Sequence, residues 1–187
     1  MAPSLTIIGI AGSLRKGSYN AALLRAARDL APAGITIVIK NIGDLPLFNQ
    51  DDEKNPPPSV RELKEAVKAA DGLLIATPEY NYSVPGVLKN ALDWVSRPYG
   101  DNSADDKPVA IMGASVSMTG TARAQYHLRQ MFVFLNGHVL NMPEVMVPAA
   151  SDKFDQDGNL TDEKTRDKVK QMLEAFVPWI KRLRGGK

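Results

Sequence analysis

Short apolar segments alternate along the chain with segments of helical periodicity. The apolar segments are rich in β-branched residues and carry few polar positions, which is typical of parallel strands covered on both faces. They lie at residues 4–10, 35–39, 72–77 and 108–112, with a fifth at 138–147 that is interrupted near Pro143. This alternation of strands with helices predicts an α/β fold, a five-stranded parallel sheet with helices on both faces.

Apolar stripes and end signals predict five helices between and after these strands. Ser18 or Asn20 is expected to cap the first helix, and Ser59 with Glu62 matches a capping box for the second. The helices are expected at about 18–31, 59–70, 87–97, 122–136 and from 161 onward. Gly137 is the expected C-terminal cap of the fourth helix, and Pro178 should kink or shorten the last one.

Composition limits the classes of protein and of site that the chain can form. Its 187 residues suit one domain spanning 1–187, because no linker or repeat divides them. The net charge of +2, without a basic stripe, disfavours nucleic acid as the main partner. Without cysteine there is no thiolate nucleophile or thiolate metal site, and two histidines are too few for a histidine-rich metal cluster. No apolar run approaches membrane-spanning length, so we expect a soluble, cytoplasmic protein without a metal.

The loop after the third predicted strand has an unusual composition for a connection between a strand and a helix. Pro78 and Pro85 fix the backbone at its two ends. Between them lie a glutamate, an asparagine and two tyrosines: Glu79, Tyr80, Asn81 and Tyr82. A stiff loop of flat rings and amides suits a planar heterocycle that forms hydrogen bonds. The alternative is a rigid connection whose tyrosines only cover the edge of the sheet.

The loop after the first predicted strand, residues 12–20, combines glycines with hydroxyl, amide and basic side chains. The helix that follows offers unpaired N–H groups and the positive end of its dipole, so this loop suits a phosphate dianion. The side chains that converge there are Ser13, Arg15, Lys16, Ser18 and Asn20. A Gly/Ser capping loop without a ligand is the alternative.

Two better-known nucleotide motifs do not fit this loop. A triphosphate-binding P-loop has a lysine directly after its second glycine, where this chain has Ser18. A dinucleotide fingerprint has an acidic residue at the end of the second strand, where this chain has Lys40 and Asn41. Because parallel strands end at one edge of the sheet, a monophosphate loop and an aromatic loop together indicate FMN lying across that edge.

Two long motifs stand in these loops. They are Gly-Ser-Leu-Arg-Lys-Gly-Ser-Tyr-Asn at 12–20 and Pro-Glu-Tyr-Asn-Tyr-Ser-Val-Pro-Gly-Val-Leu-Lys-Asn-Ala-Leu-Asp-Trp at 78–94. They resemble the NADPH-dependent FMN reductase family, and the segment 122–130 supports a closer likeness to its soluble chromate and quinone reductases. The resemblance spans residues 5–147. It implies a flavodoxin-like fold with strand order 2-1-3-4-5, bound FMN, and reduction of quinones and of chromate by NAD(P)H.

The resemblance also assigns residues to the cofactor. At the phosphate end these are Ser13, Arg15, Ser18, Tyr19 and Asn20. Along the isoalloxazine ring they are Pro78, Glu79, Tyr80 and Asn81, with Ser115 from the loop after the fourth strand. Many relatives carry extra glycines after that serine, where this chain has Ser117 and Met118, so the path of residues 116–121 stays open. The role of the long loop 41–58 is also open, and it is a candidate wall of the site.

FMN carries out the redox chemistry in this hypothesis, so we expect no protein nucleophile. The nicotinamide reduces the flavin and leaves, and the acceptor then takes the electrons at the same ring face. Backbone N–H groups of the turn 79–81 are expected to stabilise the reduced flavin, and Arg15, Lys16 and Tyr82 to contact substrates. The alternatives are a flavodoxin-type electron carrier, which the net charge disfavours, and a non-redox nucleotide-binding regulator.

The expected helix at 122–136 has two stripes. The stripe that should pack on the sheet is Leu128, Met131, Phe132 and Leu135, and the second is Arg123, Tyr126, His127, Gln130 and Phe134. Aromatic and arginine side chains are enriched at interface cores, so we expect a homo-oligomer, a dimer or a tetramer. Trp94, opposite the core stripe of the preceding helix, is expected at the interface. The resemblance suggests Glu144 as the partner of Arg123 and Tyr126 across a subunit boundary.

Overall fold

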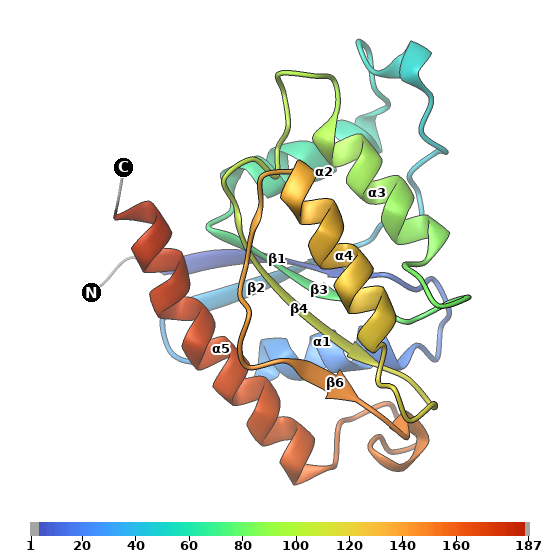
Figure 1. Cartoon of the computed structure of the whole chain (residues 1–187), viewed down its shortest axis with the longest axis vertical. Coiled ribbons are helices and arrows are strands. Elements are labelled where there is room, and N and C mark those ends of the chain that lie inside the picture. Colours follow the sequence, from blue (N-terminus) through green and yellow to red (C-terminus); the bar gives the residue numbers. More distant parts are fainter. Residues whose placement is uncertain (1–3, 186–187) are drawn as a thin grey trace.

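The strands form one parallel sheet in the middle of the molecule, with helices on both sides of it (Figure 1). The computed structural model describes residues 4–185. The strands are β1 (Leu5–Ala11), β2 (Ile35–Lys40), β3 (Gly72–Ala76), β4 (Pro108–Ala114), β5 (His138–Val139) and β6 (Val145–Val147). Their order is β2-β1-β3-β4-β5, which confirms the predicted order of a flavodoxin-like sheet.

The fifth predicted strand is divided into β5 and β6. Both pair in parallel with β4: β5 lies beside the start of β4, where His138 is opposite Pro108, and β6 lies beside its end, where Val147 is opposite Ala114. The interruption predicted near Pro143 therefore separates two short strands. Since β6 pairs with the last residues of β4, it supports the loop that follows β4.

Successive strand residues point to opposite faces of the sheet, and this alternation separates two hydrophobic cores. The helices are α1 (Tyr19–Asp29), α2 (Pro58–Ala69), α3 (Gly86–Ser96), α4 (Ala122–Phe134) and α5 (Glu163–Arg184). Ile7 and Leu74 belong to the core under α1 and α5. Ile8 and Ile75 belong to the core under α2, α3 and α4. Both faces of the sheet are therefore covered, as predicted.

The helix starts follow the sequence signals only in part. Ser18 caps α1 as predicted, because its hydroxyl accepts a backbone N–H of the first turn at 3.2 Å. Ser59 does not cap α2: the N-cap is Pro57, and the Ser59 hydroxyl donates to the carbonyl oxygen of Asp44 at 3.3 Å. The capping box predicted from Ser59 and Glu62 is therefore wrong, since prolines set the backbone that enters α2.

The ends of α4 and α5 also differ from the prediction. α4 stops at Phe134, and it is Asn136, not Gly137, that takes a positive φ, of 52°. Asparagine tolerates this conformation better than most residues. Pro178 lies inside α5, which continues to Arg184, so the helix is not shortened. None of the helices within residues 4–185 is both long and apolar enough to cross a lipid bilayer.

The long loop 41–57 folds over α3 and buries Trp94. The carbonyl oxygen of Pro46 accepts hydrogen bonds from Nε1 of Trp94 at 2.8 Å and from Nδ2 of Asn90 at 2.9 Å. The ring of Phe48 meets the indole edge-on, with ring centres 4.9 Å apart. Trp94 is 1% exposed, so the prediction that it lies at a subunit interface is wrong. Its helical position is opposite the core stripe, but the loop covers it within the same chain.

Candidate functional site

Three loops meet at the carboxyl edge of the sheet and border a cavity of about 500 Å³. They follow β1, β3 and β4, as expected when parallel strands end at one edge. The cavity is lined by Ser13, Arg15, Ser18, Tyr19, Asn20, Pro78, Glu79, Tyr80, Ala114, Ser115 and Val116. The structure thus brings together the predicted cofactor residues, with the exception of Asn81. No residue of the loop 41–57 is part of this lining, so that loop is not a wall of the cavity.

The start of α1 forms one end of the cavity. The backbone N–H groups of Tyr19 and Asn20 have no hydrogen-bond partner in the described part of the chain. Ser13 and Arg15 lie beside them on the cavity wall. Helix N–H groups, a hydroxyl and a guanidinium together form a site for an anion. Lys16, the other predicted cation, is exposed and does not line the cavity.

Asn20 faces the same cavity, but its amide holds the loop after β4. Its Nδ2 donates to the carbonyl oxygen of Ala114, and its Oδ1 accepts the N–H of Ala114, both at 2.9 Å. Asn20 is buried, so these bonds are shielded from water. The side chain therefore positions the end of β4 beside α1. Because the amide is used in this way, the group of Asn20 that can contact a phosphate is its backbone N–H.

The loop after β3 contains a tight turn. Tyr80 and Ser83 exchange backbone hydrogen bonds at 3.1 and 3.0 Å, and Asn81 and Tyr82 between them have positive φ angles of 50° and 63°. This matches a type I′ turn, for which asparagine is favoured. The N–H of Tyr80 is used within the turn and is not available to a reduced flavin. Of the N–H donors expected at 79–81, those of Glu79 and Asn81 remain.

Glu79 links this loop to α4. Its carboxylate accepts the backbone N–H groups of Arg123 at 3.0 Å and of Ala124 at 3.2 Å, and it binds Nε of Arg123 at 2.6 Å. The guanidinium carbon of Arg123 also lies 3.6 Å from the ring centre of Tyr82. The resemblance suggests Glu144 as the partner of Arg123, but within the chain the guanidinium binds Glu79.

Hydroxyl groups set the path of the loop after β4. Oγ of Ser117 lies 3.0 Å from Oγ of Ser115 and 2.9 Å from Oγ1 of Thr119. The N–H of Ser117 also donates to the Ser115 hydroxyl at 3.1 Å. Ser117, one of the two residues that stand in place of glycines, thus joins Ser115 and Thr119 in a row of hydrogen bonds, which holds Ser115 in the cavity wall.

A family model matches residues 5–152, which contain all six strands and the three cavity loops. Its description is NADPH-dependent FMN reductase. The chain belongs to this family. Membership confirms the predicted family and, with it, an oxidoreductase that works with FMN and a reduced nicotinamide.

Known proteins match the chain along nearly its whole length. An NAD(P)H-dependent FMN reductase of Pseudomonas aeruginosa is 51% identical over 186 residues, which cover 99% of this chain and 100% of the relative. A quinone reductase of Escherichia coli (strain K12) is 43% identical over 188 positions, covering 98% of this chain and 100% of the relative. The structure of FerB, a flavoenzyme NAD(P)H:(acceptor) oxidoreductase from Paracoccus denitrificans, matches with a TM-score of 0.88 at 39% identity, covering 95% of this chain and 98% of that chain.

The donor set of the cavity fits the FMN of this family. The start of α1 supplies the N–H groups, hydroxyl and guanidinium that a phosphate monoester requires. Among residues 4–185, no acidic side chain lines that end of the cavity to repel a dianion. Pro78 and Tyr80 supply flat apolar surface at the other end, and the one acid in the described lining, Glu79, has its charge paired with Arg123.

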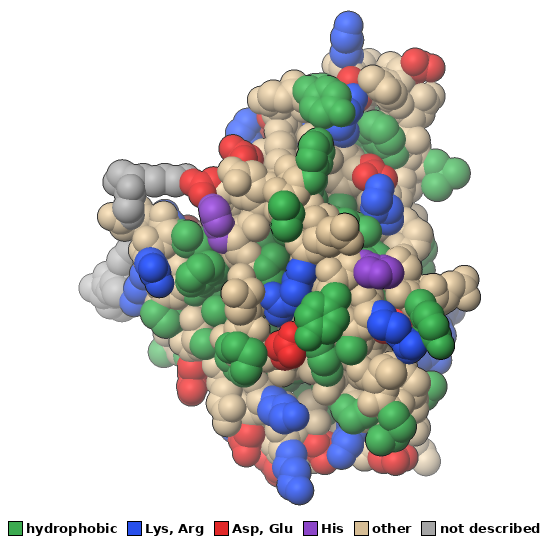
Figure 2. Space-filling view, viewed as in Figure 1, with side chains coloured by type: hydrophobic (Ala, Val, Ile, Leu, Met, Phe, Trp, Pro, Cys, Tyr) green, Lys and Arg blue, Asp and Glu red, His purple; other side chains and the backbone are tan. Residues whose placement is uncertain are grey.

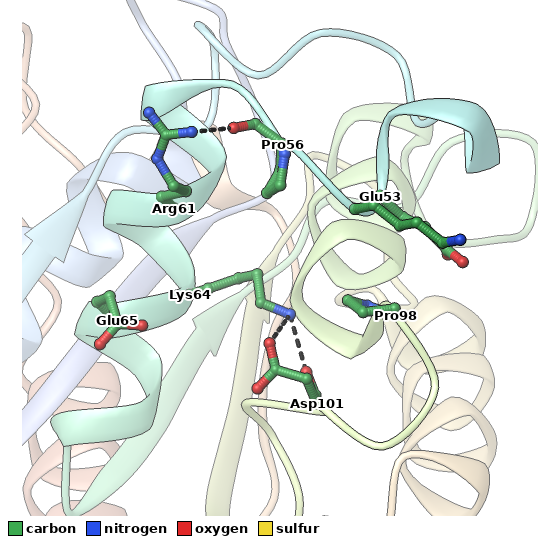
Figure 3. Close-up of a pocket in the computed structure, with 8 residues that line it drawn as sticks. Glu53, Pro56, Arg61, Lys64, Glu65, Pro98 and Asp101 are labelled. Carbon is green, nitrogen blue, oxygen red and sulfur yellow. Dashed lines mark hydrogen bonds and ion pairs between the residues drawn. The ribbon is translucent and has the colours of Figure 1, made fainter.

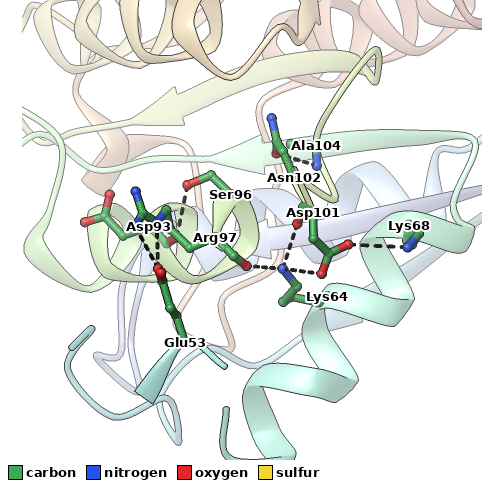
Figure 4. A network of polar contacts seen from close by, with 9 residues as sticks. All are labelled: Glu53, Lys64, Lys68, Asp93, Ser96, Arg97, Asp101, Asn102 and Ala104. Carbon is green, nitrogen blue, oxygen red and sulfur yellow. Dashed lines mark hydrogen bonds and ion pairs between the residues drawn. The ribbon is translucent and has the colours of Figure 1, made fainter. Parts of the chain in front are cut away.

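A second hollow, of about 480 Å³, lies between α2 and the segment 97–101, and contacts within the chain hold several of the charged groups that line it (Figure 3). Nζ of Lys64 donates to the carbonyl oxygens of Arg97 and Asp101 and pairs with the Asp101 carboxylate at 3.1 Å (Figure 4). Arg97 in turn binds Glu53 at 2.8 Å. The pKa of Asp101 lies below its ordinary value, first because Lys64 donates a hydrogen bond to it. These contacts tie α2 to the end of α3, which is a structural role.

Sequence reasoning missed two long-range contacts that join the cavity loops to other elements. The pair of Glu79 and Arg123 joins positions 44 residues apart, and the bonds between Asn20 and Ala114 join positions 94 residues apart. A signal existed for the first pair, because Glu79 is the one charged residue between Pro78 and Pro85 and needs a partner if it is buried. Nothing in the local sequence marks Ala114.

Proposed function

We propose that the protein is an NAD(P)H-dependent quinone reductase and that FMN binds in the cavity between the loops after β1, β3 and β4. One observation carries this proposal: a single cavity joins an anion site at the start of α1 to an exposed aromatic rim. The E. coli quinone reductase, at 43% identity, supports a quinone as the acceptor. A single domain spanning 1–187 and a cytoplasmic location stay predictions.

The residues of the cavity divide between the two ends of the cofactor. The proposed phosphate contacts are Ser13, Arg15 and Ser18 with the N–H groups of Tyr19 and Asn20. The proposed ring contacts are Pro78, Glu79, Tyr80, Asn81 and Ser115. When bound, FMN supplies the redox chemistry. The residues of this chain bind it, orient it and exclude water from one side of the ring, and none acts as a nucleophile.

Large apolar side chains stand exposed beside the cavity and favour a flat acceptor. Tyr80 and Val116 are both in the lining and are 51% and 67% exposed. Met118, in the same loop as Val116, is 80% exposed. Aromatic rings stack favourably on such side chains, whereas a small hydrated anion gains little from them. We assign Tyr82, which is also exposed, to the rim that the quinone and the nicotinamide approach.

Chromate is a second proposed acceptor, because Arg15 and Lys16 are exposed cations on the loop that borders the cavity. Positive charge beside a cleft raises the local concentration of an anion, and the phosphates of NAD(P)H benefit in the same way. Arg123 adds little to this field, since Glu79 neutralises it. We therefore expect chromate to be reduced more slowly than a quinone at equal concentration.

Steady-state kinetics of the purified protein with added FMN test this proposal. The nicotinamide, oxidised once it has given its hydride, has to leave the cavity before the quinone enters, so double-reciprocal plots at several quinone concentrations should be parallel. Turnover should need no partner protein. An electron carrier would show no turnover with quinone alone, and a non-redox regulator would bind no flavin. Intersecting lines would contradict a shared site.

We also propose a homo-oligomer, a dimer or a tetramer, assembled through the outer face of α4. Figure 2 shows this face, where separate hydrophobic side chains lie among basic and acidic ones. The exposed side chains on α4 and the segment after it include Tyr126, His127, Gln130, Val133, Phe134 and Met142. Glu144 is half-buried and has no polar partner in the described part of the chain, which supports pairing with Tyr126 of a second copy.

Sedimentation velocity tests the oligomer. The wild-type protein should sediment at a multiple of the 20.3 kDa chain mass. Phe134→Ser should shift it towards smaller species, because Phe134 is 78% exposed on α4. Val38→Ser, on the edge strand β2, is the matched control and should leave the mass unchanged. A wild-type protein that stays monomeric at micromolar concentration contradicts the proposal.

A further inference from the structure

Glu79 is the one acidic residue in the described lining of the cavity, and several donors hold its carboxylate. Its side chain is 7% exposed, and its carboxylate meets two backbone N–H groups of α4 and the guanidinium of Arg123. The distances to Nε and Nη2 of Arg123 are 2.6 and 2.5 Å. An ion pair with this geometry is charge-assisted at two points, and it fixes both side chains.

The same carboxylate caps α4. Thr121, the N-cap residue of that helix, has a φ of 70° and makes no capping bond with its side chain. Its hydroxyl accepts a hydrogen bond from Gln125 at 3.1 Å instead. Glu79 replaces the missing cap from another loop and places its charge at the positive end of the helix dipole. The position of Glu79 is therefore fixed by α4 and does not depend on a ligand.

The pair places two opposite charges beside the proposed flavin ring. Glu79 lines the cavity, and Arg123 stacks on Tyr82 at its rim. Because Glu79 is almost completely buried, its charge acts on the cavity with little screening by water. In the wild-type protein the charge of Arg123 cancels it. The reduced flavin ring carries more negative charge than the oxidised ring at neutral pH and above, so any imbalance in the pair would favour one form over the other.

We propose that the Glu79–Arg123 ion pair sets the reduction potential of the bound flavin. This inference rests on the proposed placement of the flavin ring beside Pro78 and Tyr80. Glu79 is a positioning residue that also holds the loop after β3 in place, and Arg123 supplies the compensating charge. Removing either charge alone therefore leaves the other one unbalanced beside the ring.

Redox titration of the FMN-loaded protein tests the pair, because the two single variants have opposite effects. Glu79→Gln keeps an acceptor for the N–H groups of α4 but leaves the positive charge of Arg123, so the midpoint potential should rise. Arg123→Gln leaves the negative charge of Glu79, so the potential should fall. The double variant should return towards the wild-type value. A purely structural role would move both single variants in the same direction or not at all.

The controls come from a second ion pair of similar length. Lys89 and Asp93 lie 2.7 Å apart on α3 and do not line the cavity, so Lys89→Gln and Asp93→Asn should keep the wild-type potential. If Glu79→Gln retains too little FMN for titration, the proposal is tested by comparing Arg123→Gln with Arg123→Lys. Only Arg123→Gln removes the positive charge, so only that variant should lower the midpoint potential. Equal potentials in those variants overturn the proposal. A wild-type protein that binds no FMN overturns the proposed function instead.

Discussion

Asn20 and Ala114 bind each other through both of their polar groups. The amide of Asn20 donates to the carbonyl oxygen of Ala114 and accepts its N–H, each at 2.9 Å, across 94 positions of sequence. Asn20 is in the first turn of α1, and Ala114 is the last residue of β4. The pair therefore holds the loop that carries Ser115 against the loop that we propose as the phosphate site.

Asn20→Ala should destabilise the protein and weaken FMN binding. The change leaves two buried backbone groups of Ala114 unpaired, at about 1–3 kcal/mol for each. Urea unfolding of the apo-protein measures this loss. Asn41→Ala, in an exposed turn, is the matched control and should cost less than about 1 kcal/mol. Equal stability of the two variants would show that the Asn20 bonds contribute little.

Arg15→Ala should reduce FMN affinity by about tenfold to a hundredfold. A guanidinium bound to a phosphate contributes roughly 1.5–3 kcal/mol, and every 1.4 kcal/mol is a factor of about ten in Kd. Fluorescence quenching of FMN titrated with apo-protein gives the affinity. Lys16→Ala is the control, because Lys16 is exposed and lies outside the cavity lining. Similar losses in both variants would point to general attraction by positive charge, without a defined contact.

The sheet and the positions of the cavity loops could be predicted because they depend on local patterns. Each strand is a short apolar run, and parallel strands place their following loops at one edge whatever the details of packing. The start of α1 was likewise predictable, because Ser18 caps the helix through a bond within its own turn. Local sequence was sufficient in each of these cases.

The contacts that shape the cavity could not be predicted because they join distant segments. Glu79 caps α4 across 44 positions, and no pattern near either residue specifies the other. Trp94 is a residue that local periodicity predicts to be exposed and that a distant segment buries. Helical periodicity places it on the outside of α3, and only the fold of the loop 41–57 over that helix buries it.

Trp94→Phe should lower stability without changing the oligomeric state. The variant loses the bond from Nε1 to the carbonyl oxygen of Pro46, but that oxygen still accepts Nδ2 of Asn90. Because no buried group is left unpaired, the expected cost is about 0.5–1.5 kcal/mol. Thermal unfolding and sedimentation velocity together measure the two effects. Dissociation at unchanged stability would place Trp94 at an interface after all.

Asp162 should make the stability depend on pH in the acid range. Its pKa is lowered from 3.8 to about 2, first by the hydrogen bond from Lys153 and then by that from Thr165. A carboxyl group whose pKa is lower in the folded state stabilises that state above its unfolded pKa. The stabilisation is therefore complete above about pH 4 and is lost as the pH falls towards about 2.

The comparison with Asp162→Asn isolates this effect. Asparagine can still accept a hydrogen bond from Thr165, but it does not pair with the charge of Lys153. The free energy of unfolding should differ most between wild type and variant above about pH 4, and the two curves should converge towards about pH 2. A difference that is constant across this range would exclude the ion pair as its cause.

The crystal structure of the protein with FMN tests the central claim most directly. The account predicts the phosphate at the N–H groups of Tyr19 and Asn20, within reach of Ser13 and Arg15. It predicts the ring against the loop that begins at Pro78. FMN in the hollow between α2 and the segment 97–101, or with its phosphate away from the start of α1, would contradict the account.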